Sequence, residues 1–218
     1  MVNPPPARFN FAAHLIANNA GRPDKTALID DQGTLTYGQL EDQIRRCAAG
    51  LRAIGLRRED RVLLLMHDST DWPVAFLGAL YAGVVPVAVN TLLTTDDYAF
   101  MLRDSRAQAA LVSAALLPTL QAALAQGGHE VGPVVVSRAG AALPDGCTAF
   151  DAMLAAQSLA DAADTHADEP AFWLYSSGST GKPKGTVHTQ ANLYWTAELY
   201  GKGVLNLREN DVVFSAAK

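Results

Sequence analysis

The segment from Tyr175 to Gly185 reads YSSGSTGKPKG and concentrates residue types that bind phosphate groups. Its three glycines allow backbone conformations that bring main-chain N–H groups close to a ligand. Four small hydroxyl side chains add hydrogen-bond donors, and Lys182 and Lys184 add positive charge. Held between two strands, such a loop has the chemistry of a polyphosphate site.

The spacing of this segment excludes other glycine-containing motifs. A Walker A loop needs Gly-x-x-x-x-Gly-Lys-Ser/Thr, but Ser176 stands at the first glycine position and Pro183 follows the lysine. The chain contains neither a Gly-x-Ser-x-Gly nucleophile elbow nor a Gly-x-Gly-x-x-Gly dinucleotide motif. The alternative that composition leaves open is a flexible Ser/Gly surface turn. The lysines on either side of Pro183 favour anion binding instead.

Strand-like and helix-like segments alternate along the chain, as they do in a parallel α/β sheet. Short apolar runs predict strands at 26–30, 61–66, 85–89, 109–113, 134–137, 171–176, 186–189 and 211–215. Apolar residues at helical spacing predict helices between 36 and 55, and at 72–82, 94–105, 116–125 and 192–200. We therefore expect an α/β fold with a mostly parallel sheet flanked by helices, in which the glycine-rich loop follows one strand and precedes the next.

Several helix ends carry sequence signals of their own. Thr36 with Gln39 forms the Ser/Thr-x-x-Glu/Gln pattern of a capping box, and Thr94 with Asp97 marks another helix start. The stretch 72–89 has no charged residue and approaches the length of a membrane span. Gly83 suits a helix C-terminus and divides this stretch into a short buried helix and a buried strand. We therefore expect no membrane segment.

Composition excludes several classes of protein. The chain has 218 residues, 49% apolar and 18% charged residues and a net charge of −5, which argues against intrinsic disorder. A pI near 5.5 gives no basic surface for nucleic acid. Cys47 and Cys147 form no disulfide scaffold and no Cys/His cluster, so we expect a reducing, cytoplasmic location and no metal site in the chain. The proline-rich residues 1–6 are not a signal peptide and are expected to fray.

Other residues that could suggest chemistry have simpler explanations. His188 is expected to be an ordinary strand histidine, because no partner carboxylate is apparent nearby. Residues His67, Asp68 and Asp71 are interpreted as a strand end followed by a helix N-cap. The acidic stretch 158–169 is interpreted as a solvated connector. The remaining groups are aromatic residues expected in the core (Tyr194, Trp195, Tyr200) and arginines expected on a solvated face (Arg45, Arg46, Arg52, Arg57, Arg58).

Three segments, in order, resemble motifs of the AMP-forming acyl- and aryl-CoA ligases, the adenylate-forming superfamily. Residues 176–185 are similar to its phosphate-loop signature, and residues 35–40 (LTYGQL) and 80–87 (LYAGVVPV) are similar to its earlier motifs. Within the superfamily, residues 71–76, 90–94 and 172–175 resemble benzoate–CoA ligases. The resemblance covers nearly the whole chain.

The resemblance implies a two-step reaction on an aromatic acid. Such enzymes convert a carboxylate and Mg-ATP to an acyl-adenylate and pyrophosphate, and coenzyme A then displaces AMP. The positions that match the ATP phosphate-binding motif are Ser176, Ser177, Gly178, Ser179, Thr180, Gly181 and Lys184. Among them, Thr180 is expected nearest the phosphates and the metal, and Lys184 supplies compensating charge, so both are assigned catalytic roles. Lys182 occupies a variable position and is expected to face solvent.

The same resemblance implies that the chain is incomplete. Members of the superfamily are much longer, so residues 1–218 are expected to be the N-terminal part of the large domain, with 170–218 beginning the phosphate-loop sheet. The acid pocket, the adenine contacts and the C-terminal lysine would lie elsewhere in the protein. We expect the isolated chain to be inactive and to self-associate. The open alternatives are another aryl or fatty acid–CoA ligase, or a non-catalytic nucleotide- or phosphate-binding module.

Overall fold

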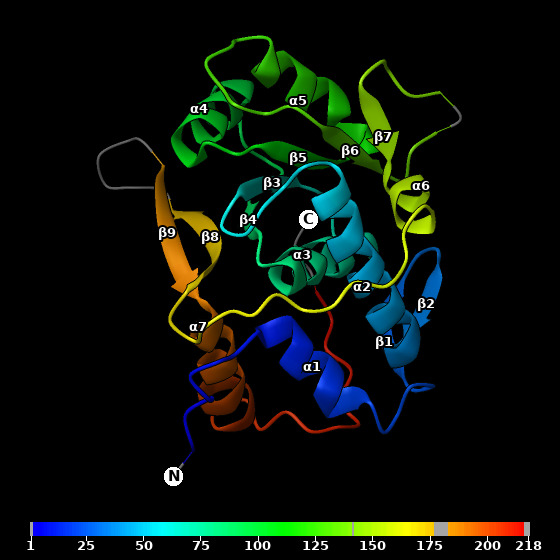
Figure 1. Ribbon diagram of the computed structural model, residues 1–218, viewed down its shortest axis with the longest axis vertical. Coiled ribbons are helices and arrows are strands. Elements are labelled where there is room, and N and C mark those ends of the chain that lie inside the picture. Colours follow the sequence, from blue (N-terminus) through cyan, green and yellow to red (C-terminus); the bar gives the residue numbers. More distant parts are fainter. Residues whose placement is uncertain (1, 141, 177–182, 216–218) are drawn as a thin grey trace.

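A seven-stranded sheet runs through the computed structural model, which describes residues 2–140, 142–176 and 183–215 (Figure 1). Its strand order is β7-β6-β5-β3-β4-β8-β9, and every neighbouring pair is parallel except the antiparallel pair β8–β9. The strands are β3 (Arg61–Leu65), β4 (Val85–Ala88), β5 (Ala109–Ser113), β6 (Val134–Ser137), β7 (Cys147–Ala149), β8 (Pro170–Ser176) and β9 (Lys184–Thr189). A separate antiparallel hairpin joins β1 (Thr26–Asp30) to β2 (Gly33–Thr36). The expected α/β fold with a mostly parallel sheet is confirmed.

Helices cover both faces of this sheet. They are α1 (Phe11–Asn19), α2 (Tyr37–Ala53), α3 (Asp71–Ala82), α4 (Thr95–Ser105), α5 (Leu117–Leu124), α6 (Phe150–Ala155) and α7 (Gln190–Trp195). A short 3₁₀ turn precedes α5, and a π-helical stretch, Thr196–Lys202, follows α7. In Figure 1, α4 and α5 lie on one side of the strands, and α2 and α3 lie on the other.

The sheet separates two apolar cores because successive side chains of a strand point to opposite faces. Leu64 of β3 and Leu111 of β5 are buried with side chains of α2, α3 and α6 in the first core. Their neighbours Leu63 and Val112 are buried with side chains of α4 and α5 in the second. Apolar runs without alternation, such as the one in β3, are therefore explained by burial on both faces.

Helix α3 explains the long uncharged stretch of the sequence. It is buried from Val74 to Ala82, and it ends at Gly83, whose φ of 77° is the left-handed conformation of a helix C-cap. The chain then enters β4, as the sequence predicts. None of the helices in the described part of the chain has the length and hydrophobicity that a bilayer crossing requires.

The capping box expected at Thr36 and the helix start expected at Thr94 are both present. The Thr36 hydroxyl accepts a hydrogen bond from the Gln39 main-chain N–H, and the Gln39 side chain accepts one from the Thr36 N–H. Thr94 and Asp97 form the same reciprocal pair at the start of α4. These short-range patterns predict helix starts well because every partner lies within four residues.

The N-terminal segment makes two contacts with distant parts of the chain. The Tyr194 hydroxyl donates to the Asn3 carbonyl oxygen at 2.8 Å. The Phe9 N–H donates to the Thr165 carbonyl oxygen at 2.8 Å. These partners lie more than 150 residues away in the sequence, and local composition carries no sign of them.

Two expectations near the end of the chain are wrong. Residues 211–215 form no strand and make no ladder with a described segment, and Val212 and Phe214 are 84% and 88% exposed. The helix expected at 192–200 begins at Gln190 and becomes π-helical from Thr196, where Tyr200 is exposed instead of buried.

Candidate functional site

The glycine-rich segment connects the two strands of an antiparallel hairpin. In the register of β8 and β9, Ser176 lies opposite Lys184, and Tyr175 lies opposite Gly185. Side chains of directly opposed residues share one face of a hairpin and lie within about 5.5 Å of each other at Cβ. The Ser176 hydroxyl and the Lys184 ammonium therefore lie on the same face, and both residues are exposed. This pair can present two donors to one anion.

Most of the other candidate residues belong to the connection itself. The candidates Ser177, Gly178, Ser179, Thr180 and Gly181, together with Lys182, lie outside the residues that the structure describes. Of the predicted phosphate-binding set, Ser176 and Lys184 are the members with a described position, and the fold brings these two together. The roles of the whole set stay predictions.

The hairpin places these residues at an edge of the sheet that commonly binds ligands. Strand β8 runs parallel to β4, with Val87 opposite Trp173 and Ala88 opposite Leu174, and β4 runs parallel to β3. Ser176 therefore ends β8 at the edge where β3 and β4 also end. Ligands of open α/β sheets bind outside the carboxyl ends of the strands.

The loop that follows β4 at the same edge is fixed by its own hydrogen bonds. The buried Tyr98 of α4 donates its hydroxyl hydrogen to the Asn90 carbonyl oxygen at 2.8 Å. The Leu92 N–H donates to the Asn90 side-chain oxygen at 2.9 Å, which closes an Asx turn. The surroundings of the hairpin are thus ordered by contacts between α4 and the strand ends.

On one face of the hairpin, Trp173 and Tyr175 pack against the second core. The Tyr175 hydroxyl donates to a carboxylate oxygen of Asp104 in α4 at 2.7 Å. Burial, together with the adjacent Asp104 carboxylate, raises the pKa of the Tyr175 hydroxyl, which keeps it a hydrogen-bond donor at neutral pH. The partners are 71 residues apart in sequence, so sequence patterns did not reveal this contact.

The packing on this face of the hairpin explains why residue 185 is a glycine. A Cβ atom placed on Gly185 would lie 3.1 Å from Trp173 Cε3 and 3.5 Å from Tyr175 Cζ. The first distance is shorter than an ordinary van der Waals contact. A glycine at this position therefore lets the two aromatic rings pack against β9.

On the other face, His188 is confirmed as a strand histidine. Its ring stacks on Phe172 with centroids 4.5 Å apart and an interplanar angle of 6°. Phe172 in turn contacts Phe76 of α3 at a centroid distance of 5.4 Å. His188 lies four residues from Lys184, or about 13 Å along the strand at ~3.3 Å per residue. This distance argues against a general-base role beside the loop.

The acidic and histidine residues after β3 have structural partners. Asp71 accepts a hydrogen bond from the Ser137 hydroxyl at 2.6 Å. The N-cap of α3 is Thr70 and makes no side-chain capping bond, so the expected side-chain cap at this helix start is wrong. Within the ranges that the structure describes, no cluster of three or more His, Cys, Asp or Glu residues could hold a metal ion.

The arginines of α2 bind the connector rather than only solvent. Arg45 donates to the Ala160 carbonyl oxygen at 3.0 Å, and Arg46 donates to the Gln157 carbonyl oxygen. Beyond α2, Arg58 pairs with Glu169. The expected solvated face is therefore wrong for these three, and the acidic connector is attached to the domain by them.

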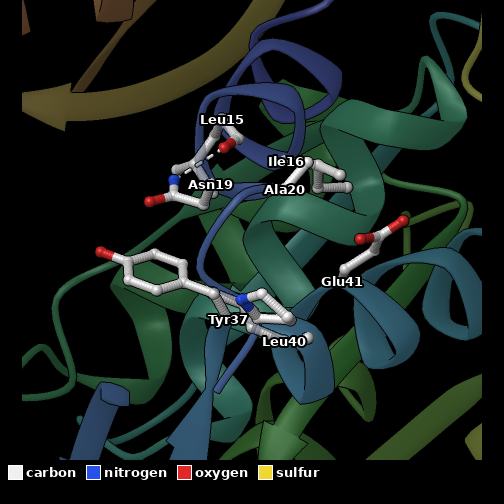
Figure 2. Close-up of a pocket in the computed structure, with 9 residues that line it drawn as sticks. Leu15, Ile16, Asn19, Ala20, Tyr37, Leu40 and Glu41 are labelled. Atoms are coloured by element: carbon white, nitrogen blue, oxygen red, sulfur yellow. Dashed lines mark hydrogen bonds between the residues drawn. The ribbon is translucent and has the colours of Figure 1, made fainter. Parts of the chain in front are cut away.

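A small cavity lies elsewhere, between α1 and the start of α2 (Figure 2). Its volume is about 80 Å³, and Leu15, Asn19, Tyr37 and Glu41 are among the side chains around it. Figure 2 shows both apolar and polar side chains around it, and none of its lining residues belongs to the segment 176–185. The cavity is therefore separate from the hairpin site.

A parallel α/β sheet with a hydroxyl-, glycine- and lysine-rich connection at its carboxyl edge is typical of nucleotide-binding enzymes. The chain belongs to the family described as AMP-binding enzyme, whose profile matches residues 15–218. It is 49% identical over 216 residues to benzoate–CoA ligase of Thauera aromatica, covering 98% of this chain and 40% of that protein. It is 39% identical to a 4-hydroxybenzoate–CoA/benzoate–CoA ligase of Rhodopseudomonas palustris, covering 96% of this chain and 39% of that protein.

Solved structures agree with this family and with the fold. A benzoate CoA ligase from Burkholderia xenovorans LB400 has a TM-score of 0.85 and 51% identity, with 94% of this chain and 40% of that one covered. An anthranilate CoA ligase solved with anthranoyl-AMP has a TM-score of 0.89 and 32% identity, with 95% and 40% covered. The chain spans about 40% of the length of the curated relatives it matches and corresponds to their N-terminal part.

Proposed function

We propose that the protein carrying this chain activates an aromatic carboxylic acid of the benzoate type and converts it to a CoA thioester. The carboxylate oxygen attacks the α-phosphorus of ATP, and pyrophosphate leaves. The CoA sulfur then attacks the acyl carbon of the acyl-adenylate, AMP leaves with the bonding electrons, and the thiol proton passes to solvent or a base. Location in the cytoplasm is part of the proposal.

The observation that carries the proposal is the β8–β9 hairpin. It ends at the carboxyl edge of a parallel sheet with Ser176 directly opposite Lys184, the first and last members of the predicted phosphate-binding set. The choice of an aromatic acid rests on the relatives, since a relative named for benzoate is 49% identical and one named for long-chain fatty acids is 34% identical.

Within this function, the roles of the segment follow from its chemistry. Residues 176–181 supply main-chain and hydroxyl donors to the ATP phosphates, and Lys184 offsets the negative charge that grows as pyrophosphate departs. Mg²⁺ enters as part of the substrate Mg-ATP. Mg²⁺ bound in this way takes most of its ligands from phosphates and water, so the hairpin needs no cluster of carboxylates to hold it.

An assay of the full-length protein tests the proposal. Benzoate, 4-hydroxybenzoate, 2-aminobenzoate and a long-chain fatty acid are each incubated with Mg-ATP and CoA, and AMP and thioester are measured. We expect benzoate to give the highest kcat/KM. A preference for the fatty acid would support the alternative substrate class. Nucleotide binding without AMP formation from any acid would instead support a non-catalytic binding module.

A further inference from the structure

The outer end of the hairpin extends beyond the parallel sheet. The β4–β8 ladder includes Trp173 and Leu174, whereas the β8–β9 ladder continues to Ser176 opposite Lys184. In the described ladders, Tyr175 and Ser176 therefore pair with β9 but not with β4. Beyond Leu174, side-chain contacts with the domain therefore add to what the main chain of the hairpin provides in positioning this end.

Tyr175 supplies such a contact. Its hydroxyl reaches Asp104 in the last turn of α4, with a donor–acceptor distance of 2.7 Å. A carboxylate in the last turn of a helix is unfavourable for the helix itself, because the C-terminal end of the helix dipole is negative. The charge of Asp104 thus does not stabilise α4. Its favourable interaction is the hydrogen bond that it accepts from Tyr175. A bond to an ionised acceptor is also stronger than one to a neutral acceptor.

Strand β9 leaves space for the Tyr175 ring. Gly185 lies directly across from Tyr175, and the absence of a side chain there leaves room for the rings of Trp173 and Tyr175. The phenol is therefore held between β9 and α4. Its immediate neighbours in the hairpin, Ser176 and Lys184, are the described members of the phosphate-binding set.

We propose that the Tyr175–Asp104 hydrogen bond positions the outer end of the β8–β9 hairpin, and with it Ser176 and Lys184, for the nucleotide. This inference rests on the proposed function. Tyr175 is a positioning residue: its hydroxyl bonds to Asp104 and acts on the nucleotide only through the strand that it holds. The bond matters for the adenylation step, in which the phosphates must be oriented, more than for transfer of the acyl group to CoA.

The test uses Tyr175→Phe, Asp104→Asn and the double variant in the full-length protein. Acid-dependent exchange between ATP and pyrophosphate reports adenylation, and thioester formation from supplied benzoyl-adenylate reports the second step. We expect each single variant to lower kcat/KM for ATP in the exchange reaction by roughly tenfold, as loss of a hydrogen bond to a charged group would. The kcat/KM of the double variant for ATP should be little lower than that of either single variant, because both substitutions remove the same bond. The second step should be unchanged.

Tyr194→Phe is the matched control, because it also removes a tyrosine hydroxyl bond of 2.8 Å, in the helix α7 that follows the end of β9 opposite to Lys184. Thermal unfolding measures the stability that each Phe variant loses, and only Tyr175→Phe should lose adenylation. Adenylation by Tyr175→Phe equal to that of Tyr194→Phe would overturn the inference. So would additive losses in the double variant, or equal losses in both half-reactions.

Failure of the proposed function is distinguishable from failure of this inference. Wild-type protein that shows no exchange with any acid contradicts the function. Hydrogen exchange at the main-chain amides of β9 then tests the positioning contact alone. Faster exchange near Gly185 in Tyr175→Phe than in Tyr194→Phe supports the contact, and equal exchange rates overturn it.

Discussion

Lys182 and Lys184 are two positions apart in one segment, yet different roles are expected for them. Lys184 begins β9 opposite Ser176, so its side chain leaves the hairpin on a defined face. Lys182 matches a variable position of the family motif and is expected to face solvent. The same substitution at the two positions therefore separates a specific contact from a general effect of positive charge.

We predict that Lys184→Ala and Thr180→Ala slow adenylation by the full-length protein, by ~10²–10³-fold if each removes one preorganised contact to developing charge. Thioester formation from supplied benzoyl-adenylate should suffer less, because no pyrophosphate leaves in that step. Lys182→Ala is the control and should behave like wild type. Unchanged adenylation in Lys184→Ala would remove the phosphate-loop assignment. Equal losses in both steps would indicate an effect on folding or domain closure.

Asp30 gives a prediction about stability at the residue scale. Burial alone raises its pKa, but N–H groups of Thr70 and Gln32, at 2.8 and 2.9 Å, and the charge of Arg138 outweigh burial. Its pKa therefore lies below the usual value. A depressed pKa in the folded state stabilises the protein above the unfolded-state pKa, near 3.9, and this contribution is lost as the pH falls through the folded-state pKa.

We predict that Asp30→Asn lowers the free energy of unfolding at pH 7 by about 1–3 kcal/mol, because a buried charged acceptor is lost. The difference from wild type should shrink as the pH falls below the unfolded-state pKa, because the unfolded chain then takes up a proton that folded Asp30 does not. Asp31→Asn is the control, since Asp31 also pairs with Arg138 but its side chain is 79% exposed. Denaturant unfolding at several pH values measures both. A difference for Asp30→Asn that is independent of pH would contradict the argument.

At the element scale, α2 and α3 pack closely at Gly78. A Cβ atom on Gly78 would lie 2.6 Å from both Cβ and Sγ of Cys47 in α2, a distance that real contacts do not reach. Cys47 is fully buried, and burial raises the pKa of its thiol. The two helices cannot accept an added methyl group here unless they move apart.

We predict that Gly78→Ala lowers the free energy of unfolding by about 1–3 kcal/mol, the usual cost of overpacking a core. Gly21→Ala is the control, because a Cβ atom there would meet nothing within 4 Å. Urea unfolding of the two variants compares them directly. Equal stability of both would mean that α2 and α3 adjust to the added atom without cost.

The elements also show what sequence patterns predict and what they miss. The strands at 26–30, 109–113 and 134–137 are confirmed with the expected bounds, because short apolar runs next to turn residues mark strands. Helices α1 and α6 and strands β2 and β7 were not expected, since they are short or weakly patterned. Their stability comes from tertiary contacts, such as the bond from the Asn10 amide to the Leu80 carbonyl oxygen.

The candidate site likewise has one part that sequence patterns indicate and another that they do not. The motif at 176–185 could be proposed as a phosphate-binding loop from residue types, because such a loop is local in sequence. The contact between Tyr175 and Asp104, and the reason for a glycine at position 185, could be recognised only from the fold. They depend on α4 and on the register of β8 with β9, neither of which leaves a pattern in neighbouring residues.

At the scale of the whole molecule, the end of the described chain carries exposed apolar side chains. Val204 is 69% exposed, Val212 is 84% exposed and Phe214 is 88% exposed. Strand β9 is also the last strand in the described sheet, and Val187 on it is 47% exposed. An unpaired strand edge beside apolar surface is a common route to association between chains.

We predict that the isolated 218-residue chain self-associates. Sedimentation velocity should show larger species as the concentration rises, and a hydrophobic dye should bind. The variant Val212→Ser/Phe214→Ser should reduce both signals, because it removes exposed apolar area without touching either core. Replacing Leu159, which is 45% exposed on the connector, by Ser is the control and should change them less. A monomer at all concentrations that binds no dye would contradict the prediction. Association that persists in the double variant would indicate that the chains pair through the edge of β9 instead, because main-chain hydrogen bonding there does not depend on apolar side chains.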